Sequence, residues 1–191
     1  SKYKSFDQLI HSPPALPNVG YIEEKSLFVD SFVLYTNFFV LCIRIMSYTY
    51  QNINHWQGTV ETYFEINMDS PIVDKDLILP DGTNGILFIQ NGELIRTNEQ
   101  GKHVLTTNKI YLFGQKTRAV SYQFQSFPFR ACGFKIAPHA LSLLFDVAGD
   151  HATDKVLHLT CVQKRFEKIA NLLSDASLKN QLFAFMEHCM Y

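Results

Sequence analysis

The feature that most constrains this chain is a run of short apolar segments, separated by tight turns, between Thr59 and Ile136. In "LILPDGTNGILFIQNGELIR", residues 77–96, a Pro-Asp-Gly turn is followed by Asn91-Gly92. Asparagine and glycine tolerate positive φ, and this pair between two apolar runs is the strongest short hairpin signal. We therefore expect a strand on each side of Asn91-Gly92, joined as a β-hairpin.

Several of these segments alternate between apolar and polar residues. In "TVETYFEI", Val60, Phe64 and Ile66 share one face of a strand, and Glu61, Tyr63 and Glu65 share the other, which predicts a half-buried strand. The segments "KIYLFG", "AVSYQFQSF" and "FRACGFKI" follow. Six or more short strands with tight turns indicate an antiparallel barrel or sandwich.

The last third of the chain has helical spacing instead. Residues 138–149 begin with a proline suited to a first helical turn and end with a glycine suited to a C-terminal cap. Thr160 and Gln163 form a capping-box pattern at the start of a second amphipathic segment. Residues 177–191 form a third segment with helical spacing of apolar residues. The expected fold class is therefore mainly β, with helices at the C-terminus.

The composition is typical of a globular protein, and its charge balance provides no general positive field that would attract nucleic acid. The 191 residues are 47% hydrophobic and 18% charged, which suits one domain with a good core. The net charge of -1 provides no basic field for a phosphate backbone. The cysteines are widely spaced, which is typical of thiols in a reducing compartment such as the cytoplasm: Cys42, Cys132, Cys161 and Cys189.

The N-terminal region is the hardest to interpret. Residues 26–45 are nearly long enough to cross a bilayer, but Asp30, Asn37 and Arg44 interrupt them, and charges make a spanning helix costly. We expect no membrane segment. Met46-Ser47 resembles a natural start, so we expect an N-terminal extension of unknown role over 1–45, a β-barrel over 46–137 and helices over 138–191.

Three motifs, in their order and spacing, carry a family resemblance: Pro80-Asp81-Gly82, Phe113-Gly114-Gln115, and Phe134 with Pro138. Together with the terminal helices, they make residues 48–188 similar to the cupin-like N-terminal sensor domain of AraC-type transcriptional regulators. The resemblance implies a jelly-roll barrel that receives an effector or contacts a partner, followed by a helical dimerisation segment. It also implies a C-terminal pair of helix-turn-helix motifs. We find no counterpart of these here, so we expect contact with DNA only through a helix-turn-helix domain absent from this chain.

Three functions are consistent with the residues. The first is a ligand-sensing and dimerisation domain of an AraC-like regulator, the second a small cupin-type enzyme acting on a sugar or small organic acid, and the third a purely structural interaction module. The enzyme would need a metal or an activated nucleophile. The seven histidines include no His-x-His pair, and Cys132, although near Arg130, has the apolar neighbours of a structural thiol. We expect no catalytic residue, metal or cofactor.

An effector pocket would be formed by aromatic and polar side chains on the predicted strands. Small barrels are usually filled by their own side chains or hold one small ligand, and a pocket needs a few polar groups among apolar ones. Asp81 has a structural interpretation, as the first residue of an Asx-type turn before Gly82. The ligand-binding candidates are Tyr63, Phe88, Phe113, Gln115, Tyr122, Phe124 and Arg130.

An apolar stripe runs along one face of the last predicted helix. It is formed by Leu178, Leu182, Phe185, Met186 and Cys189. The preceding helix could close this stripe within one chain. However, further apolar residues widen it, and large apolar patches usually mark association sites. We expect a homodimer formed mainly through residues 178–190.

We predict that this chain alone does not bind duplex DNA at physiological salt, because 17 basic residues are offset by 18 acidic ones. The densest basic group, Lys164, Arg165 and Lys168, has the spacing of a solvated helix face. Fluorescence anisotropy with a random duplex should show no binding, and salt-sensitive micromolar binding would contradict the prediction.

Overall fold

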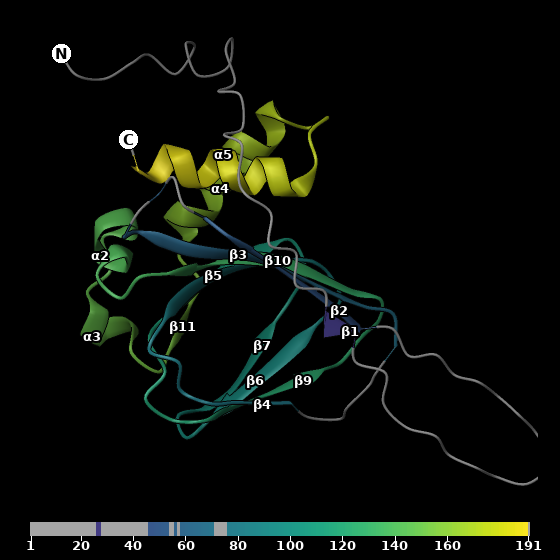
Figure 1. Ribbon diagram of the computed structural model, residues 1–191, viewed down its shortest axis with the longest axis vertical. Helices are drawn as coiled ribbons and strands as arrows, with labels where there is room; N and C mark the ends of the chain where they lie inside the picture. Colours follow the sequence, from purple (N-terminus) through teal and green to yellow (C-terminus); the bar gives the residue numbers. More distant parts are fainter. Residues whose placement is uncertain (1–25, 28–45, 54–55, 57, 71–75, 191) are drawn as a thin grey trace, which may run out of the picture.

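A computed structural model describes residues 26–27, 46–53, 56, 58–70 and 76–190 (Figure 1). The predicted N-terminal extension lies outside these residues, except for the two that form β1. The expectation about a membrane segment falls in the same region. In the part of the chain that the structure describes, no helix is both long and apolar enough to span a membrane.

Within the described residues, two antiparallel sheets face each other and enclose a barrel (Figure 1). The larger sheet has seven strands in the order β1 (Ser26–Leu27), β2 (Met46–Asn52), β3 (Val60–Met68), β10 (Phe129–Ile136), β5 (Asn84–Asn91), β8 (Lys109–Phe113) and β11 (Val156–Leu157). The smaller has four, in the order β4 (Asp76–Ile78), β9 (Val120–Phe124), β6 (Leu94–Asn98) and β7 (Gly101–Leu105). The predicted jelly-roll architecture is confirmed.

Helices cover the outer face of the larger sheet, on the side away from the smaller one (Figure 1). These helices are α4 (Thr160–Leu172) and α5 (Leu178–Met190). Two short helices, α2 (Ala140–Phe145) and α3 (Gly149–Ala152), follow β10 and lie toward one end of the barrel. Mainly β structure followed by C-terminal helices is the fold class that the sequence predicts.

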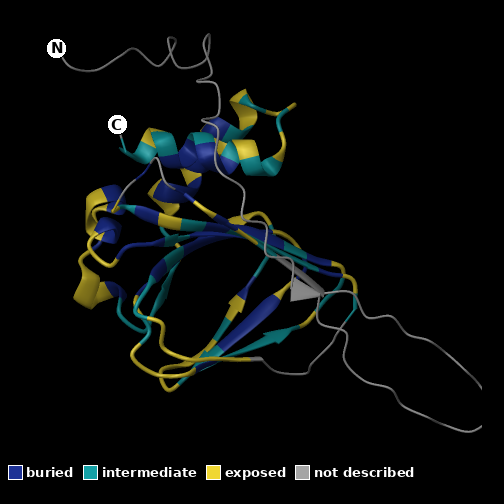
Figure 2. Cartoon of the chain, in the orientation of Figure 1, coloured by how far each residue is buried: buried dark blue, intermediate teal, exposed yellow. Residues whose placement is uncertain are grey.

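The central strands of the larger sheet are therefore buried on both faces (Figure 2). Leu87 and Ile89 of β5 belong to the core inside the barrel, whereas Ile86 and Phe88 belong to the core beneath the helices. In β3, Tyr63 is only 1% exposed although it lies on the predicted polar face. The expectation of a half-buried β3 was wrong, because alternation cannot show that helices will cover the second face.

A register shift explains a second error in β3. The pairing of β10 with β3 moves by one residue between Lys135 and Ile136. Val60 consequently joins the core beneath the helices, whereas Phe64 and Ile66 pack against the barrel core. A bulge inverts the side-chain direction of every residue beyond it, so strict alternation failed at Val60.

The turn at Asn91-Gly92 does not form a hairpin, which corrects the prediction. It joins β5 of one sheet to β6 of the other, and these two strands do not pair. Gly92 has φ 88°, and a Cβ there would lie 2.8 Å from the Phe129 ring and 2.9 Å from the Ser126 carbonyl oxygen. The turn is thus a corner between sheets, and glycine fits it sterically as well as conformationally. The Asx interpretation of Asp81 agrees with its Oδ1, which accepts the Thr83 N–H at 3.4 Å.

Two details of the helices also differ from the sequence predictions. The expected helix over 138–149 ends at Phe145, because Asp146 adopts a left-handed conformation, and α3 then begins at Gly149. The capping box at Thr160 is not formed. Instead, Gln163 Oε1 accepts the Ile110 N–H at 2.8 Å, and Gln163 Nε2 donates to the Asn108 carbonyl oxygen at 3.1 Å. Gln163 therefore joins α4 to the end of the sheet.

The apolar stripe of α5 is buried inside its own chain. Leu182, Phe185 and Met186 are each 0% exposed, and Leu178 and Cys189 pack partly buried against the same core. Assigning the homodimer interface to Leu182, Phe185 and Met186 was wrong, because these fully buried side chains offer no surface to a second chain, whereas Leu178 and Cys189 stay partly accessible. Closure of the stripe within one chain, the alternative interpretation, is what the structure shows.

We predict that Phe185→Ala destabilises this chain by about 3–5 kcal/mol, the usual effect of emptying a core aromatic site. The matched control is Leu172→Ala on α4, because Leu172 is 47% exposed and should change stability by less than about 0.5 kcal/mol. Urea unfolding followed by circular dichroism measures both. Equal effects of the two substitutions would contradict the burial of α5.

Candidate functional site: the polar end of the barrel

The interior of the barrel has a closed apolar end. Phe124 and Phe129 stack edge to face there, with ring centroids 4.8 Å apart. Met68, Ile89 and Phe129 are 0% exposed and fill the same core. This end contains the corner at Asn91-Gly92, and its described interior side chains are apolar.

Arg96 lies farther along the interior, toward the opposite end. It lies on the same face of β6 as Leu94, two positions earlier, and it pairs in register with Tyr122 of β9. It is only 1% exposed. Its Nη2 donates to the Asp154 carbonyl oxygen at 3.0 Å, but Nε and Nη1 have no partner among the described residues. Burying a charged donor without a partner costs several kcal/mol, so such a group needs an explanation.

Other charged groups lie at the same end of the barrel. Asp81 Oδ1 is 2.8 Å from Lys116 Nζ, and Asp81 Oδ2 is 3.6 Å from Lys135 Nζ. Burial acts to raise the pKa of Asp81, but Lys116 and Thr83 outweigh it, so the pKa lies below its ordinary value and the carboxylate is charged. With Arg118, Glu99 and Asp154, which lie at the same end, four cations accompany three anions. The excess is one positive charge, and an anionic ligand would complement it.

Tyr122 adds a neutral hydroxyl beside the guanidinium. Burial raises the pKa of Tyr122 above its ordinary value, although the charge of Arg96 and a hydrogen bond between Arg96 and the hydroxyl act in the opposite direction. The hydroxyl therefore stays protonated at neutral pH and can donate a hydrogen bond to an anion or accept one from Arg96.

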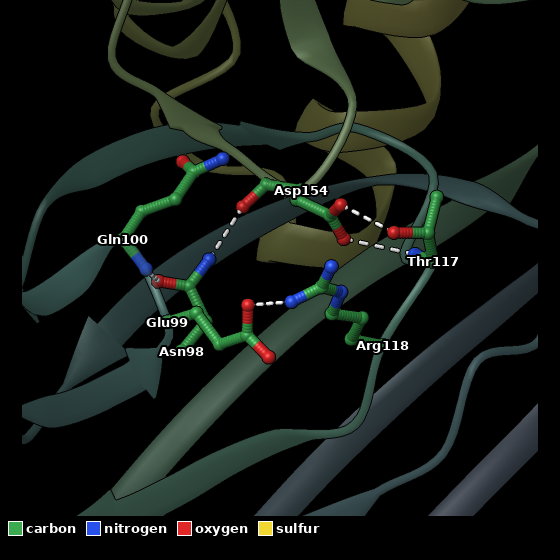
Figure 3. A network of polar contacts seen from close by, with 6 residues as sticks. All are labelled: Asn98, Glu99, Gln100, Thr117, Arg118 and Asp154. Carbon is green, nitrogen blue, oxygen red and sulfur yellow. Dashed lines mark hydrogen bonds and ion pairs between the residues drawn. The ribbon is translucent and has the colours of Figure 1, made fainter.

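A cavity of about 240 Å³ opens at this end of the barrel (Figure 3). The carbonyl group of Asp154, which binds Arg96, belongs to its wall, and the ion pair between Glu99 and Arg118 lies beside it. The lining residues are Asn98, Glu99, Gln100, Thr117, Arg118, Val120 and Asp154. Arg96 and Tyr122 are not among the lining residues, and the hydrogen bond to Asp154 is what connects Arg96 to the wall of this cavity.

A second cavity, of about 270 Å³, lies on the outer face of the larger sheet at the start of α5. Two of its polar groups donate to protein partners: the Tyr63 hydroxyl to Glu65 at 2.7 Å, and Lys179 to Gln51 at 2.8 Å. Burial raises the pKa of the Cys132 thiol in its wall to about 12, so the thiol is not an activated nucleophile. This cavity is the weaker candidate.

The predicted ligand residues divide between the two faces of the larger sheet. Phe113, Tyr122 and Phe124 pack against the core inside the barrel. Gln115 lies at the polar end with an exposed side chain, and its carbonyl oxygen accepts the Asp154 N–H at 2.9 Å.

Tyr63, Phe88 and Arg130 do not face the barrel interior, which corrects their assignment to one pocket with the other candidates. Tyr63 and Arg130 line the second cavity instead. Tyr63 and Phe88 are buried beneath the helices, and Phe88 stacks on Phe166 with centroids 4.9 Å apart. Arg130 pairs with Asp69 and donates to the Met68 carbonyl oxygen at 3.0 Å.

Sequence reasoning missed Arg96. The available signal was its place in "ELIRT", where alternation puts it on the same face as Leu94. The spacing of the histidines in the sequence predicts no metal site. Among the residues that the structure describes, no three His, Cys, Asp or Glu side chains lie close enough together to hold a metal ion.

The two sheets and the helical layer define a cupin-like jelly-roll domain with C-terminal helices. More particularly, the chain belongs to the family described as "Domain of unknown function (DUF6597)", which matches residues 48–158. No curated protein matches the chain.

Solved structures with a similar fold include regulators and an enzyme. The AraC-like transcriptional activator CuxR is 8% identical over 77% of this chain and 53% of its own, with a TM-score of 0.47. A cupin domain of an XRE family transcriptional regulator from Enterobacter cloacae is 13% identical over 47% and 95%, with a TM-score of 0.36. A predicted oxalate decarboxylase from Thermotoga maritima is 8% identical over 48% and 81%, with a TM-score of 0.37.

This chain spans about half the length of some of these proteins, including 51% of an HTH_3 family transcriptional regulator from Vibrio cholerae. At such low identities the similarity concerns the general fold and does not extend to ligand or activity.

We predict that Arg96→Met leaves the ligand-free protein as stable as before or stabilises it by about 1 kcal/mol, because it removes a buried charge that the fold only partly satisfies. Arg118→Met is the matched control, since the Arg118 side chain is 65% exposed and should change stability by less than about 0.5 kcal/mol. Urea unfolding at neutral pH measures both. A loss of more than about 2 kcal/mol for Arg96→Met would show that the fold itself satisfies the guanidinium.

Proposed function

We propose that this chain is a non-enzymatic ligand-sensing domain of an AraC-like transcriptional regulator, located in the cytoplasm, and that it binds a small anionic molecule at the polar end of its barrel. Arg96 supplies the charge, Tyr122 a hydroxyl, and the cavity beside Asp154 the entrance. The helices packed on the outer face of the larger sheet form the surface through which occupancy is communicated.

The observation that carries this proposal is the pair of unpartnered nitrogens on Arg96, at 1% exposure. Folding places these donors where water reaches them poorly, and the free energy of that desolvation opposes folding. An anion that accepts hydrogen bonds from Nε or Nη1 removes this penalty upon binding. Charge-assisted bonds of this type are also about twice as strong as neutral ones.

The cupin-enzyme alternative has less support. An enzyme at the polar end would need a group that exchanges a proton or attacks a substrate near neutral pH. Burial raises the pKa of Tyr122, which keeps its hydroxyl protonated at neutral pH, and the guanidinium of Arg96 offers only hydrogen-bond donors. These groups are suited to binding a charged molecule rather than to transforming it.

Partners beyond the effector are also part of the proposal. DNA would be contacted through a helix-turn-helix domain outside this chain. A homodimer remains a prediction, but it must use residues other than the buried side chains of α5.

The proposal predicts that carboxylate ligands stabilise the chain and that uncharged analogues do not. Differential scanning fluorimetry with glucuronate and citrate, each compared with glucose, tests this on the purified chain. A ligand present at 100 times its Kd adds about 2.7 kcal/mol to the free energy of unfolding. Arg96→Met should abolish this stabilisation, and Lys102→Met, at an exposed position of β7 that lines neither cavity, should keep it.

Two results would contradict the proposal. The first is an equal response to glucuronate and glucose, which would exclude charge recognition. The second is a response to the anions that persists in Arg96→Met, which would place any binding elsewhere on the molecule.

A further inference from the structure

Asp154 contacts the interior of the barrel through its carbonyl oxygen. This oxygen accepts a hydrogen bond from Asn98 Nδ2 at 2.7 Å (Figure 3) and another from Arg96 Nη2 at 3.0 Å. Two side chains of β6 thus converge on one backbone atom. The contacts join residues 58 and 56 positions apart in the chain. Because Nη2 is held in this way, the guanidinium has a fixed orientation in which Nε and Nη1 remain unpartnered among the described residues.

The side chain of Asp154 holds a different segment, the loop after β8. Its Oδ1 accepts the Thr117 N–H at 2.8 Å, and its Oδ2 accepts the Thr117 hydroxyl (Figure 3). Asp154 has φ 60°, a left-handed conformation that aspartate tolerates better than most residues. That conformation allows the carbonyl to contact β6 while the carboxylate contacts Thr117.

The backbone around Asp154 continues toward the helices and is fixed to β8. The Gly114 N–H donates to the Lys155 carbonyl oxygen at 3.2 Å, and β11 pairs with β8 immediately afterwards. A Cβ on Gly114 would lie 1.8 Å from the Ala152 carbonyl oxygen, so the two segments approach as closely as glycine permits. The chain then enters α4 at Thr160, and Phe166 of α4 packs on Phe185 of α5 with centroids 5.6 Å apart.

We propose that Asp154 is the positioning residue of the anion site, which orients Arg96 and couples its occupancy to the segment leading into α4. An anion bound to Nε or Nη1 changes the strength and geometry of the hydrogen bond between Nη2 and the Asp154 carbonyl oxygen. The Asp154 backbone transmits that change to residues 152–160. This inference rests on the proposed function for its ligand, but the contacts of Asp154 can be tested without any ligand.

The first test is hydrogen exchange by mass spectrometry on the ligand-free chain. Arg96→Met removes the Nη2 hydrogen bond, and loss of one charge-assisted bond should make amides in 114–118 and 152–160 exchange about tenfold faster. The control is Lys102→Met, which removes an exposed positive charge on β7 that lines neither cavity, and it should leave these amides unchanged. Unchanged exchange over 152–160 in Arg96→Met would overturn the coupling.

The second test separates positioning from a general structural role. Asp154→Gly keeps the backbone carbonyl and suits φ 60°, but it removes the acceptors for Thr117. Asp154→Asn keeps one acceptor oxygen and tolerates the same conformation. We expect Asp154→Gly to raise exchange in 114–118 and to reduce the additional effect of Arg96→Met on 152–160, while Asp154→Asn behaves like the unmodified chain.

Two outcomes would contradict the role of Asp154: equal behaviour of Asp154→Gly and Asp154→Asn, or an Arg96→Met effect of the same size in the Asp154→Gly background. Failure of the proposed function has a different signature, since it would show as no anion-dependent stabilisation while the ligand-free exchange pattern still appeared.

Discussion

Burial of the larger sheet on both faces determines most of this structure. One face closes the barrel against the smaller sheet, and the other carries α4 and α5 (Figure 1). Two cores therefore form on opposite sides of the same strands, one beneath the helices and one inside the barrel. The helices pack their apolar faces against this sheet, and Leu182 and Phe185 are therefore inaccessible to solvent.

The core inside the barrel does not fill the barrel with apolar groups alone. A guanidinium and a tyrosine hydroxyl occupy positions on β6 and β9 where a small barrel could have placed leucine or phenylalanine. Asp81 is neutralised by Lys116 and Lys135, but Arg96 has only one carbonyl partner beyond its own strand. Natural proteins commonly retain a poorly satisfied polar group where function requires it. In our account, the missing partner of Arg96 is a ligand anion.

Much of the fold could be predicted from local sequence patterns. The strands around Val120–Phe124 and Phe129–Ile136, and the helices at Thr160 and Leu178, follow directly from apolar periodicity. The corner at Asn91-Gly92 could not be predicted in this way, because both a hairpin and a corner between sheets need positive φ at glycine. Only the contact of Gly92 with Phe129, 37 positions away, distinguishes them.

The candidate site was harder to predict for the same reason. Tyr122, Phe113 and Phe124 were found because aromatic residues on alternating strands are visible in sequence. The state of Arg96 depends on the burial of β6 and on Asp154, whose carbonyl group contacts it across 58 positions of the chain. Sequence alternation indicates which way Arg96 points, but it contains no information about which of its donors lack partners.

The central claim is that Arg96 is held inside the barrel with donors reserved for an anion. The most direct measurement is a ¹H–¹⁵N NMR correlation of the Arg96 Nε–H group, assigned by its loss in Arg96→Met. Our account predicts a resolved, slowly exchanging resonance that shifts downfield when a binding anion is added, together with changes at Tyr122 and Asp154. A resonance that exchanges rapidly with water, or that stays unchanged while an anion stabilises the protein, would contradict it.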